Sequence, residues 1–541
     1  MRNDRRSASF FLVGVLVVLV GCLESDPQPS PSSSDVGEGR YYVPGADTTS
    51  ADDGYYGSND TCGEVSVPYD VVSPGEDASM AQDCVSDSAS VPDEPVAPPV
   101  ANPFIETSEE NTSTFSIDVD TASYTIMRMN LQSGSLPNPD GVRVEEYVNY
   151  FNIYYPQPDD EHPFSINLDA APSYFGEDYK LLRIGLQGYE VPEEELKDAN
   201  LVFLVDVSGS MSSPGKLTLV KFFLTTLVDH LQPNDTLGIV VYAGTQAVLL
   251  EPTPVQDVAA IKAAINGLGA GGSTAGAAGI ATAYELAEGA MKPGGINRVI
   301  LCTDGDFNVG LTGSALIAKI EEYREKGVTL SVFGFGMSGY NDEQMEQLAD
   351  NGNGNYGFID SQAEVLKVIE EKLFAILQVI AKDVKIQIEF NADTVFAWRL
   401  LGYENRVMEN QEFTNDKKDA GEIGSGHNVT AFYELEMTPE YADASLAEVR
   451  FRYKQPDGVE SIEIIRSFDT ADIEEAFEAA ASDFRFGAAV VEFAEILRNS
   501  EYTEGARFDE ILEIATAAGG LETDERIEFL DLIEIADSLW P

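Results

Sequence analysis

Short apolar runs alternate with amphipathic stretches along the middle of the chain. Leu201–Val205 has no polar residue, as expected for a strand buried on both faces of a parallel sheet. Similar runs follow at Leu237–Tyr242, Val299–Cys302 and Leu330–Phe335. An amphipathic helix follows the first run, with Val220, Leu224, Leu227 and Leu231 on one face. Further helical patterns separate the later runs, around 256–267, 275–291, 314–326 and 342–350. This order predicts an α/β domain over residues 199–380, with a doubly wound, Rossmann-like parallel sheet.

The segments on either side of that domain show a two-residue alternation of polar and apolar positions, typical of half-buried strands. Before the domain, the pattern predicts strands at Thr114–Val119, Phe164–Leu168 and Lys180–Gln187, and helices at Ala122–Leu131 and Val144–Phe151. After it, the pattern predicts strands at Val384–Phe390, Val429–Leu435, Val449–Tyr453 and Ile462–Ile465. We therefore expect an N-terminal α+β flank at 104–198 and a β-rich flank at 381–468. The simplest architecture is one β-sandwich built from both flanks, with the α/β domain inserted in it.

The last segment, residues 469–541, has the periodicity of helices and predicts a C-terminal helical region. Five apolar residues are expected on one face of its first helix: Ile473, Phe477, Phe484, Ala488 and Val491. Further helices are expected near 506–518 and 523–538.

The N-terminus has the composition of a targeting segment. Three arginines precede the apolar stretch Phe10–Val20, which stops just before Gly21 and Cys22. A small residue followed by cysteine at this place is typical of a bacterial lipobox, in which the cysteine is lipidated and becomes the new N-terminus. We predict a lipoprotein signal peptide at 1–22 and a lipid on Cys22, with an uncleaved N-terminal anchor as the alternative. Leu23, which is not aspartate, favours sorting to the outer membrane, so we expect a lipid-anchored protein of the bacterial cell envelope, facing the periplasm or the outside.

Residues 23–103 are rich in Ser, Pro, Asp and Gly and lack periodic apolar positions. Such a segment cannot bury enough apolar surface to offset its ordering entropy, so we interpret it as a disordered, acidic tether. It contains Cys62 and Cys84, which would be able to pair in an oxidising compartment. Cys302 lies in an apolar run instead and is predicted to be a buried free thiol.

The charge changes which partners are plausible. The chain of 541 residues has 33 Lys and Arg against 93 Asp and Glu, which gives a net charge of −60. We expect no nucleic-acid binding, because a phosphate backbone selects basic protein surfaces. Contact with the membrane is expected only through the N-terminal lipid.

Three loops at the carboxyl ends of the predicted strands offer hard oxygen ligands. Asp206, Ser208 and Ser210 follow the first strand at positions i, i+2 and i+4. A glycine-rich loop offers Thr274, and Asp304 follows the third strand. Ligands in an open parallel sheet bind outside the carboxyl ends of the strands, and hard oxygens suit Mg²⁺.

With these residues in place, the sequence resembles the von Willebrand factor type A (VWA) family. Its DVSGSM segment at 206–211, the threonine of GGST and the TDG at 303–305 match the family's metal ion-dependent adhesion site at every ligand position. The resemblance implies Mg²⁺, or another divalent cation such as Mn²⁺ or Ca²⁺. It also implies direct ligation by Ser208 and Ser210, direct or water-mediated ligation by Thr274, and mainly water-mediated contacts from Asp206 and Asp304. One coordination position stays open for an Asp or Glu carboxylate of a protein partner.

Two segments outside the α/β domain resemble a narrower group, the bacterial lipoproteins of the YfbK type. Phe115–Tyr124 is similar to that group's N-terminal signature, and Gly421–Tyr433, with its GHNVTA sequence, is similar to its signature after the domain. The resemblance carries no known enzymatic activity.

Two other functions compete with metal-dependent capture of a partner. One is a structural module whose metal only stabilises the fold, and the other is a metal-dependent hydrolase. A serine nucleophile would need a base, and the three histidines, His162, His230 and His427, stand in no recognised partner motif. We therefore expect no enzymatic activity.

Overall fold

The computed structural model describes residues 100–541 except 177, 273–276, 306–313, 337–341, 440, 442–443, 504 and 506. The predicted signal peptide, the tether with Cys62 and Cys84, and the lipid site Cys22 all lie outside the described residues. Within them, Cys302 is a buried free thiol, as predicted. None of the helices in the described ranges is long and apolar enough to cross a membrane.

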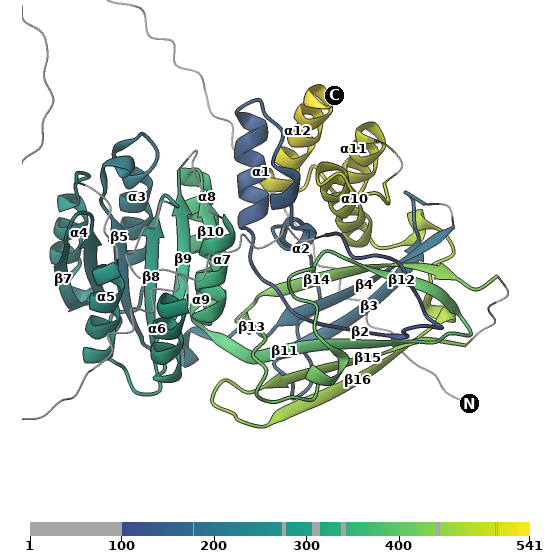
Figure 1. Cartoon of the computed structure of the whole chain (residues 1–541), viewed down its shortest axis with the longest axis horizontal. Helices are drawn as coiled ribbons and strands as arrows, with labels where there is room; N and C mark the ends of the chain where they lie inside the picture. The colour runs from purple at the N-terminus through teal and green to yellow at the C-terminus, as the bar shows by residue number, and fades with distance from the viewer. Residues whose placement is uncertain are drawn as a thin grey trace, which may run out of the picture. The chain divides into compact units, whose positions relative to one another are not determined.

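The α/β domain has a six-stranded sheet in the order β10-β9-β8-β5-β6-β7 (Figure 1). Its strands are β5 Ala199–Asp206, β6 Thr236–Tyr242, β7 Gln246–Pro254, β8 Ile296–Thr303, β9 Thr329–Phe335 and β10 Tyr356–Ile359. All neighbours pair in parallel except β7, an antiparallel edge strand. The doubly wound sheet is confirmed. The sequence pattern missed β7, because this edge strand leaves most of its side chains exposed, and β10, because it is only four residues long.

Helices cover both faces of this sheet. One face packs against α3 Leu217–Val228, α4 Val258–Gly267 and α8 Gln362–Glu370, and the other against α5 Ala277–Gly289, α6 Ser314–Glu325 and α7 Asp342–Asn351. Phe203 and Val205 of β5 lie in the first core, whereas Val202 and Leu204 lie in the second. Every residue of β5 is therefore buried, which explains its continuous apolar run.

The two flanks build one β-sandwich, as predicted. One sheet has the order β1-β12-β14-β4-β3, with β1 Ile105–Glu106, β12 Val395–Leu401, β14 Asn428–Met437, β4 Tyr179–Gly188 and β3 Phe164–Pro172. The other has β13 Gly421–Gly424, β11 Val379–Phe390, β15 Ser445–Lys454 and β16 Ser461–Asp469, with β2 Thr112–Ser116 paired to β11. Strands before and after the α/β domain thus pair directly: Ile386 of β11 lies opposite Phe115 of β2.

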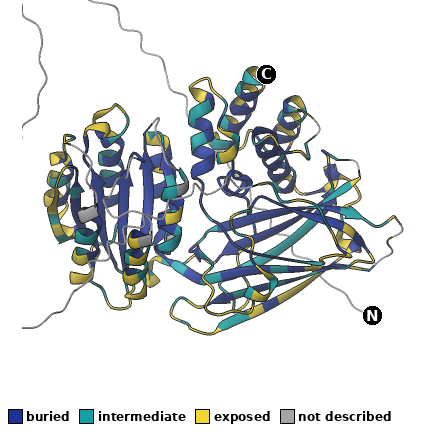
Figure 2. Cartoon of the chain, viewed as in Figure 1, coloured by how far each residue is buried: buried dark blue, intermediate teal, exposed yellow. Residues whose placement is uncertain are grey.

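Helices from both ends of the folded chain share a third core. They are α1 Ala122–Gln132, α2 Val144–Val148, α10 Ser482–Leu497, α11 Phe508–Ala517 and α12 Asp524–Leu539. The ring of Phe151 lies 5.0 Å from that of Phe486 and 5.4 Å from that of Phe529, between ring centroids. Figure 2 shows α10 largely in the colour of buried residues, in agreement with its twelve buried residues.

Two predicted boundaries were wrong. Ile473 and Phe477 precede the first C-terminal helix, which begins only at Ser482. The backbone of Glu474 donates instead to the carbonyl of Ala170 at 2.9 Å, so this segment pairs with the edge of β3. Phe477 is nevertheless buried in the helical core, which accounts for its place in the apolar pattern. The predicted helix Val144–Phe151 ends at Val148. The pattern also missed α8 and α9, Leu373–Leu377.

Candidate metal centre

The order of the strands places the two predicted carboxylates at one edge of the sheet. Asp206 is the last residue of β5, and Asp304 follows Thr303, the last residue of β8. The two strands are parallel neighbours, with Val205 opposite Cys302. The chain winds in opposite directions from β5, to β6 on one side and to β8 on the other, so this edge is the topological switch point of the sheet.

The loop after β5 turns its hydroxyls toward each other. A hydrogen bond from the Ser208 N–H to Asp206 Oδ1, 2.7 Å long, stabilises the tight turn at the start of this loop. The Ser208 and Ser210 hydroxyl oxygens are then 2.8 Å apart. Asp206 and Ser208 are buried, and Ser210 is exposed, so the group has a buried base and an open outer side.

The glycine-rich loop lies against this turn. The Gly209 N–H donates to Gly272 O at 3.1 Å, and the Gly271 N–H donates to Val207 O at 2.8 Å. Gly272 has a φ of +107°, a conformation that favours glycine. Thr274, two residues further on, lies outside the described residues. The structure thus brings Asp206, Ser208, Ser210 and Asp304 together and does not describe the fifth predicted ligand.

Two further side chains belong to this site and were missed by sequence reasoning. The Lys216 ammonium donates to Asp304 Oδ2 at 2.8 Å. Its stem lies over Gly336, where a Cβ would come within 2.8 Å of the lysine Cε. The hydroxyl of Tyr242, buried at the end of β6, lies close to Asp206 and Thr303. Lys216 follows Asp206 by ten residues, and nothing in the sequence pattern linked the two.

The donor set fits a divalent cation. Asp304 Oδ1 is buried and accepts no hydrogen bond from the residues that the structure describes. Burial raises the pKa of Asp206, against hydrogen bonds from Ser208 that lower it. A buried carboxylate oxygen without a donor is costly, and a dication beside it offsets that cost. Lys216 neutralises one of the two acids, which leaves one net negative charge on the set of oxygen ligands.

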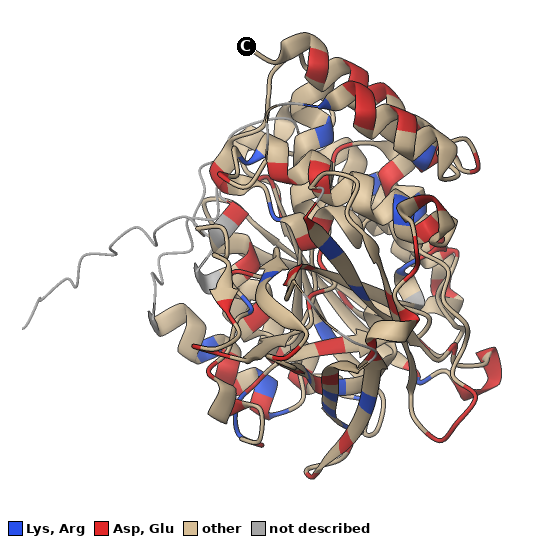
Figure 3. Cartoon of the chain, turned by 90° about the vertical axis from the view of Figure 1, so that its right-hand side faces the viewer, with Lys and Arg blue, Asp and Glu red and all other residues tan. Residues whose placement is uncertain are grey.

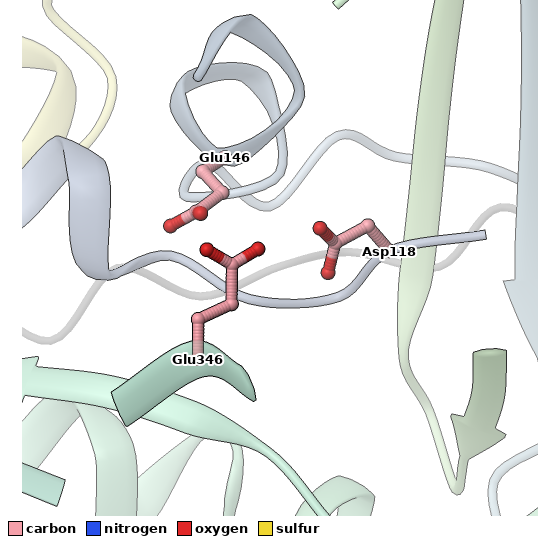
Figure 4. Close-up of side chains that lie close together, drawn as sticks. All are labelled: Asp118, Glu146 and Glu346. Carbon is pink, nitrogen blue, oxygen red and sulfur yellow. The ribbon is translucent and has the colours of Figure 1, made fainter. Parts of the chain in front are cut away.

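A second group of carboxylates has a different explanation. Asp118, Glu146 and Glu346 each offer an oxygen within 4.8 Å of the others, from the β2–α1 connection, α2 and α7 (Figure 4). Arg143 pairs with Glu146 and Glu346, and Arg406 Nε lies 3.2 Å from Asp118 Oδ2. These arginines make the group an ion-pair cluster between the α/β domain and the flank. The sequence could not reveal it, because its members are up to 288 residues apart.

Glu145, next to this cluster, gives a testable pH dependence. Burial, followed by Glu404 and Asp118, raises its pKa from 4.5 to about 8. Between those values the native state keeps a proton that the unfolded chain releases, so rising pH favours unfolding. We expect the free energy of unfolding of the wild type, measured by urea titration, to fall as the pH rises between these values. Glu145→Gln lacks the titrating group, so its slope should be smaller by about 1 kcal/mol per pH unit.

The control is Glu513→Gln, which changes an exposed residue of α11. Its unfolding free energy should follow the wild-type slope. Equal slopes for the wild type and Glu145→Gln would show that the Glu145 carboxyl is already ionised in the native protein at low pH, contrary to this interpretation.

The three histidines lie away from the serine hydroxyls. His162 Nδ1 is 3.0 Å from the Tyr453 hydroxyl in the sandwich, and exposed His230 has its Nδ1 2.9 Å from Thr226 O. His427 lies in the turn before β14. The described geometry therefore provides Ser208 with no histidine base.

Family models match three parts of the chain. The von Willebrand factor type A domain matches residues 200–372, "von Willebrand factor" matches 93–183, and "Uncharacterized protein YfbK, C-terminal" matches 375–539. Uncharacterized protein YfbK of Escherichia coli K12 is 39% identical over 465 residues, which cover 81% of this chain and 80% of the relative. This chain belongs to the YfbK family of VWA proteins. The two matched segments outside 200–372 contain Phe115–Tyr124 and Gly421–Tyr433, the segments that resembled this group.

More distant relatives share less with this YfbK family member. Uncharacterized protein sll0103 of Synechocystis is 28% identical over 209 residues, 38% of this chain and 47% of that protein. Among solved structures, a von Willebrand factor type A protein from Catenulispora acidiphila aligns with a TM-score of 0.41 at 18% identity, covering 69% of this chain and 90% of its own.

Proposed function

We propose that this YfbK family protein captures a protein partner through a divalent cation, Mg²⁺ in the first place, held in its VWA domain. The observation that carries the proposal is the convergence of two acids and two serine hydroxyls at the switch point, with buried Asp304 Oδ1 lacking a donor among the described residues. Ser208 and Ser210 would hold the ion directly, and Asp206 and Asp304 would act through water. Thr274 would complete the set.

The bound ion would supply an electrophilic centre for an Asp or Glu carboxylate of the partner. The chain's own residues support this in two ways. Asp206 and its hydrogen bond fix the turn that presents the two hydroxyls, and Lys216 removes one negative charge that would repel an incoming carboxylate. With one residual negative charge in the set, a dication leaves a net positive site on a strongly acidic protein.

We further propose that the protein is held in the cell envelope by a lipid on Cys22 and reaches its partner by the segment 23–103. The acidic exterior supports this arrangement over direct adhesion of the folded part to anionic lipid. Figure 3 shows several Asp and Glu positions along the helix that ends at the C-terminus, with few Lys and Arg positions among them.

A second candidate function is a structural module in which the ion only stabilises the fold. The buried Asp206–Ser208 hydrogen bond favours this alternative, because it serves local folding without any partner. The two proposals predict different results for the same variants. An enzymatic role is not proposed, because the family and the site offer an interaction module and no identified base.

A capture experiment distinguishes them. The full chain is immobilised and exposed to envelope extract, with Mg²⁺ or with EDTA, and bound proteins are quantified. Metal-dependent capture predicts at least a tenfold loss of bound partner with EDTA, its recovery when Mg²⁺ is restored, and the same loss in Ser208→Ala and Asp304→Asn.

Ser213→Ala is the matched control, because Ser213 is an exposed residue just beyond the loop. This variant should bind as much partner as the wild type does. Circular dichroism of each variant checks that the chain remains folded. Capture that is indifferent to EDTA, together with a lower thermal midpoint of Ser208→Ala, would favour the structural module and refute the adhesion proposal.

A further inference from the structure

A small pocket lies where the VWA domain joins the sandwich and the helices. Its volume is about 50 Å³, and its lining comes from three places: residues 149–152 after α2, residues 426–428 before β14, and the segment from the last turn of α8 into α9, which contributes Lys367, Glu371, Lys372 and Ala375. One buried water needs roughly 10–15 Å³ by the same measure, so the pocket has room for three or four waters or one small anion.

Lys372 brings an unpaired charge into this pocket. Its ammonium is buried and has no hydrogen-bond partner among the described residues. The nitrogen lies 5.8 Å from the centroid of the Tyr150 ring, and Lys367 Nζ lies 5.1 Å from the same centroid. Two ammonium groups therefore gather at one aromatic ring, and an unpaired buried charge of this kind is strongly unfavourable.

The nearby carboxylates are already engaged. Glu371 accepts from Lys367 at 2.8 Å, and Glu364 accepts from Arg128 at 2.9 Å and from the Tyr150 hydroxyl at 3.0 Å. Lys367 has a second carboxylate, Glu525, at 3.5 Å. Lys372 is thus the one lysine of this pair that the described side chains do not neutralise.

The imidazole of His427, which also lines the pocket, is a second group able to donate. Burial and, next, the charge of Lys372 lower its pKa to about 3, so its imidazole is neutral at pH 7 and keeps one N–H. Burial and, next, Lys367 lower the pKa of Lys372 to about 8, which leaves most of it as ammonium at pH 7. The pocket therefore presents donors and positive charge in a protein whose surface is acidic.

We propose that this pocket binds a small oxyanion, a carboxylate or a phosphate, through the Lys372 ammonium and the His427 imidazole. The anion pairs the buried charge. It also links the end of α8, the residues after α2 and the turn before β14, so it ties the VWA domain to the sandwich. His427 and Asn428 belong to the GHNVTA segment, which the metal site does not use.

Titration of the full chain with sodium acetate and, separately, with sodium phosphate tests this site. Ionic strength is kept constant with a bulky organic sulfonate, and the thermal midpoint and the heat of binding are measured. A ligand at a hundredfold excess over its Kd should raise the midpoint by about 3 °C. The arm that responds more strongly identifies the carboxylate or the phosphate as the ligand class.

Lys372→Met should abolish the response and remain folded, because it replaces an unpaired charge by an apolar chain of similar length. His427→Gln should weaken binding about tenfold, and Lys417→Met, an exposed lysine, should respond as the wild type does. A wild type that responds to neither anion, or an equal response in Lys372→Met, would overturn the proposal and leave a water-filled pocket with a neutral lysine.

Discussion

Arg128→Met should destabilise the protein by about 3–5 kcal/mol. The guanidinium of Arg128, on α1, binds both carboxylate oxygens of Asp360, at 2.9 and 2.6 Å, and Glu364 of α8 at 2.9 Å. It also donates to the Tyr150 hydroxyl and to Glu528 of α12. Methionine keeps the length of the chain but leaves buried Asp360 and Glu364 without their cation, which is the costly outcome. The free energy of unfolding from urea titration measures the effect.

Arg450→Met is the matched control. Arg450 pairs with Glu448 and Glu389 on the sandwich surface, where its side chain is 35% exposed. Pairs of this kind contribute at most about 1 kcal/mol, so the control should lose far less stability than Arg128→Met. Equal losses in the two variants would contradict the idea that Arg128 joins α1, the VWA domain and the last helix.

The sequence predicted two kinds of element best: strands that are buried on both faces, and strands that have one face buried along their whole length. All of β5 is buried, so its apolar run was unmistakable. Val384–Phe390 of β11 alternates cleanly because one face lies in the sandwich core. β7 gave no such signal, because an edge strand with exposed side chains has no single buried face. Ile473 was misplaced since its backbone pairs with a strand far away in sequence.

The candidate metal site was predictable in its ligands and not in its surroundings. Asp206, Ser208 and Ser210 form a local motif, and the order of the strands places Asp304 beside them. Lys216 reaches the site because its stem packs over Gly336, and Tyr242 because it is buried beside β5. No spacing in the sequence predicts either arrangement. The pocket at Lys372 depends on three distant segments and was likewise invisible before the fold was known.

Asp206→Ala should lower the affinity for Mg²⁺ by about 100-fold, the upper end of what loss of an outer ligand costs. The substitution removes a carboxylate from the site and also the acceptor of the Ser208 N–H, so the loop loses its fixed turn. Asp206→Asn keeps an acceptor for that N–H and removes only the charge, so it separates the two effects. Isothermal titration calorimetry measures the affinity.

The direct test of the metal centre is therefore a calorimetric Mg²⁺ titration of the wild type, Asp206→Ala, Asp206→Asn and Asp198→Asn. Asp198 immediately precedes β5 at the opposite edge of the sheet and serves as the control. We predict one Mg²⁺ per chain in the wild type and in Asp198→Asn, a loss of about 100-fold in affinity in Asp206→Ala, and a smaller loss of about tenfold in Asp206→Asn. Unchanged affinity in the Asp206 variants would contradict the assignment of the ion to this site.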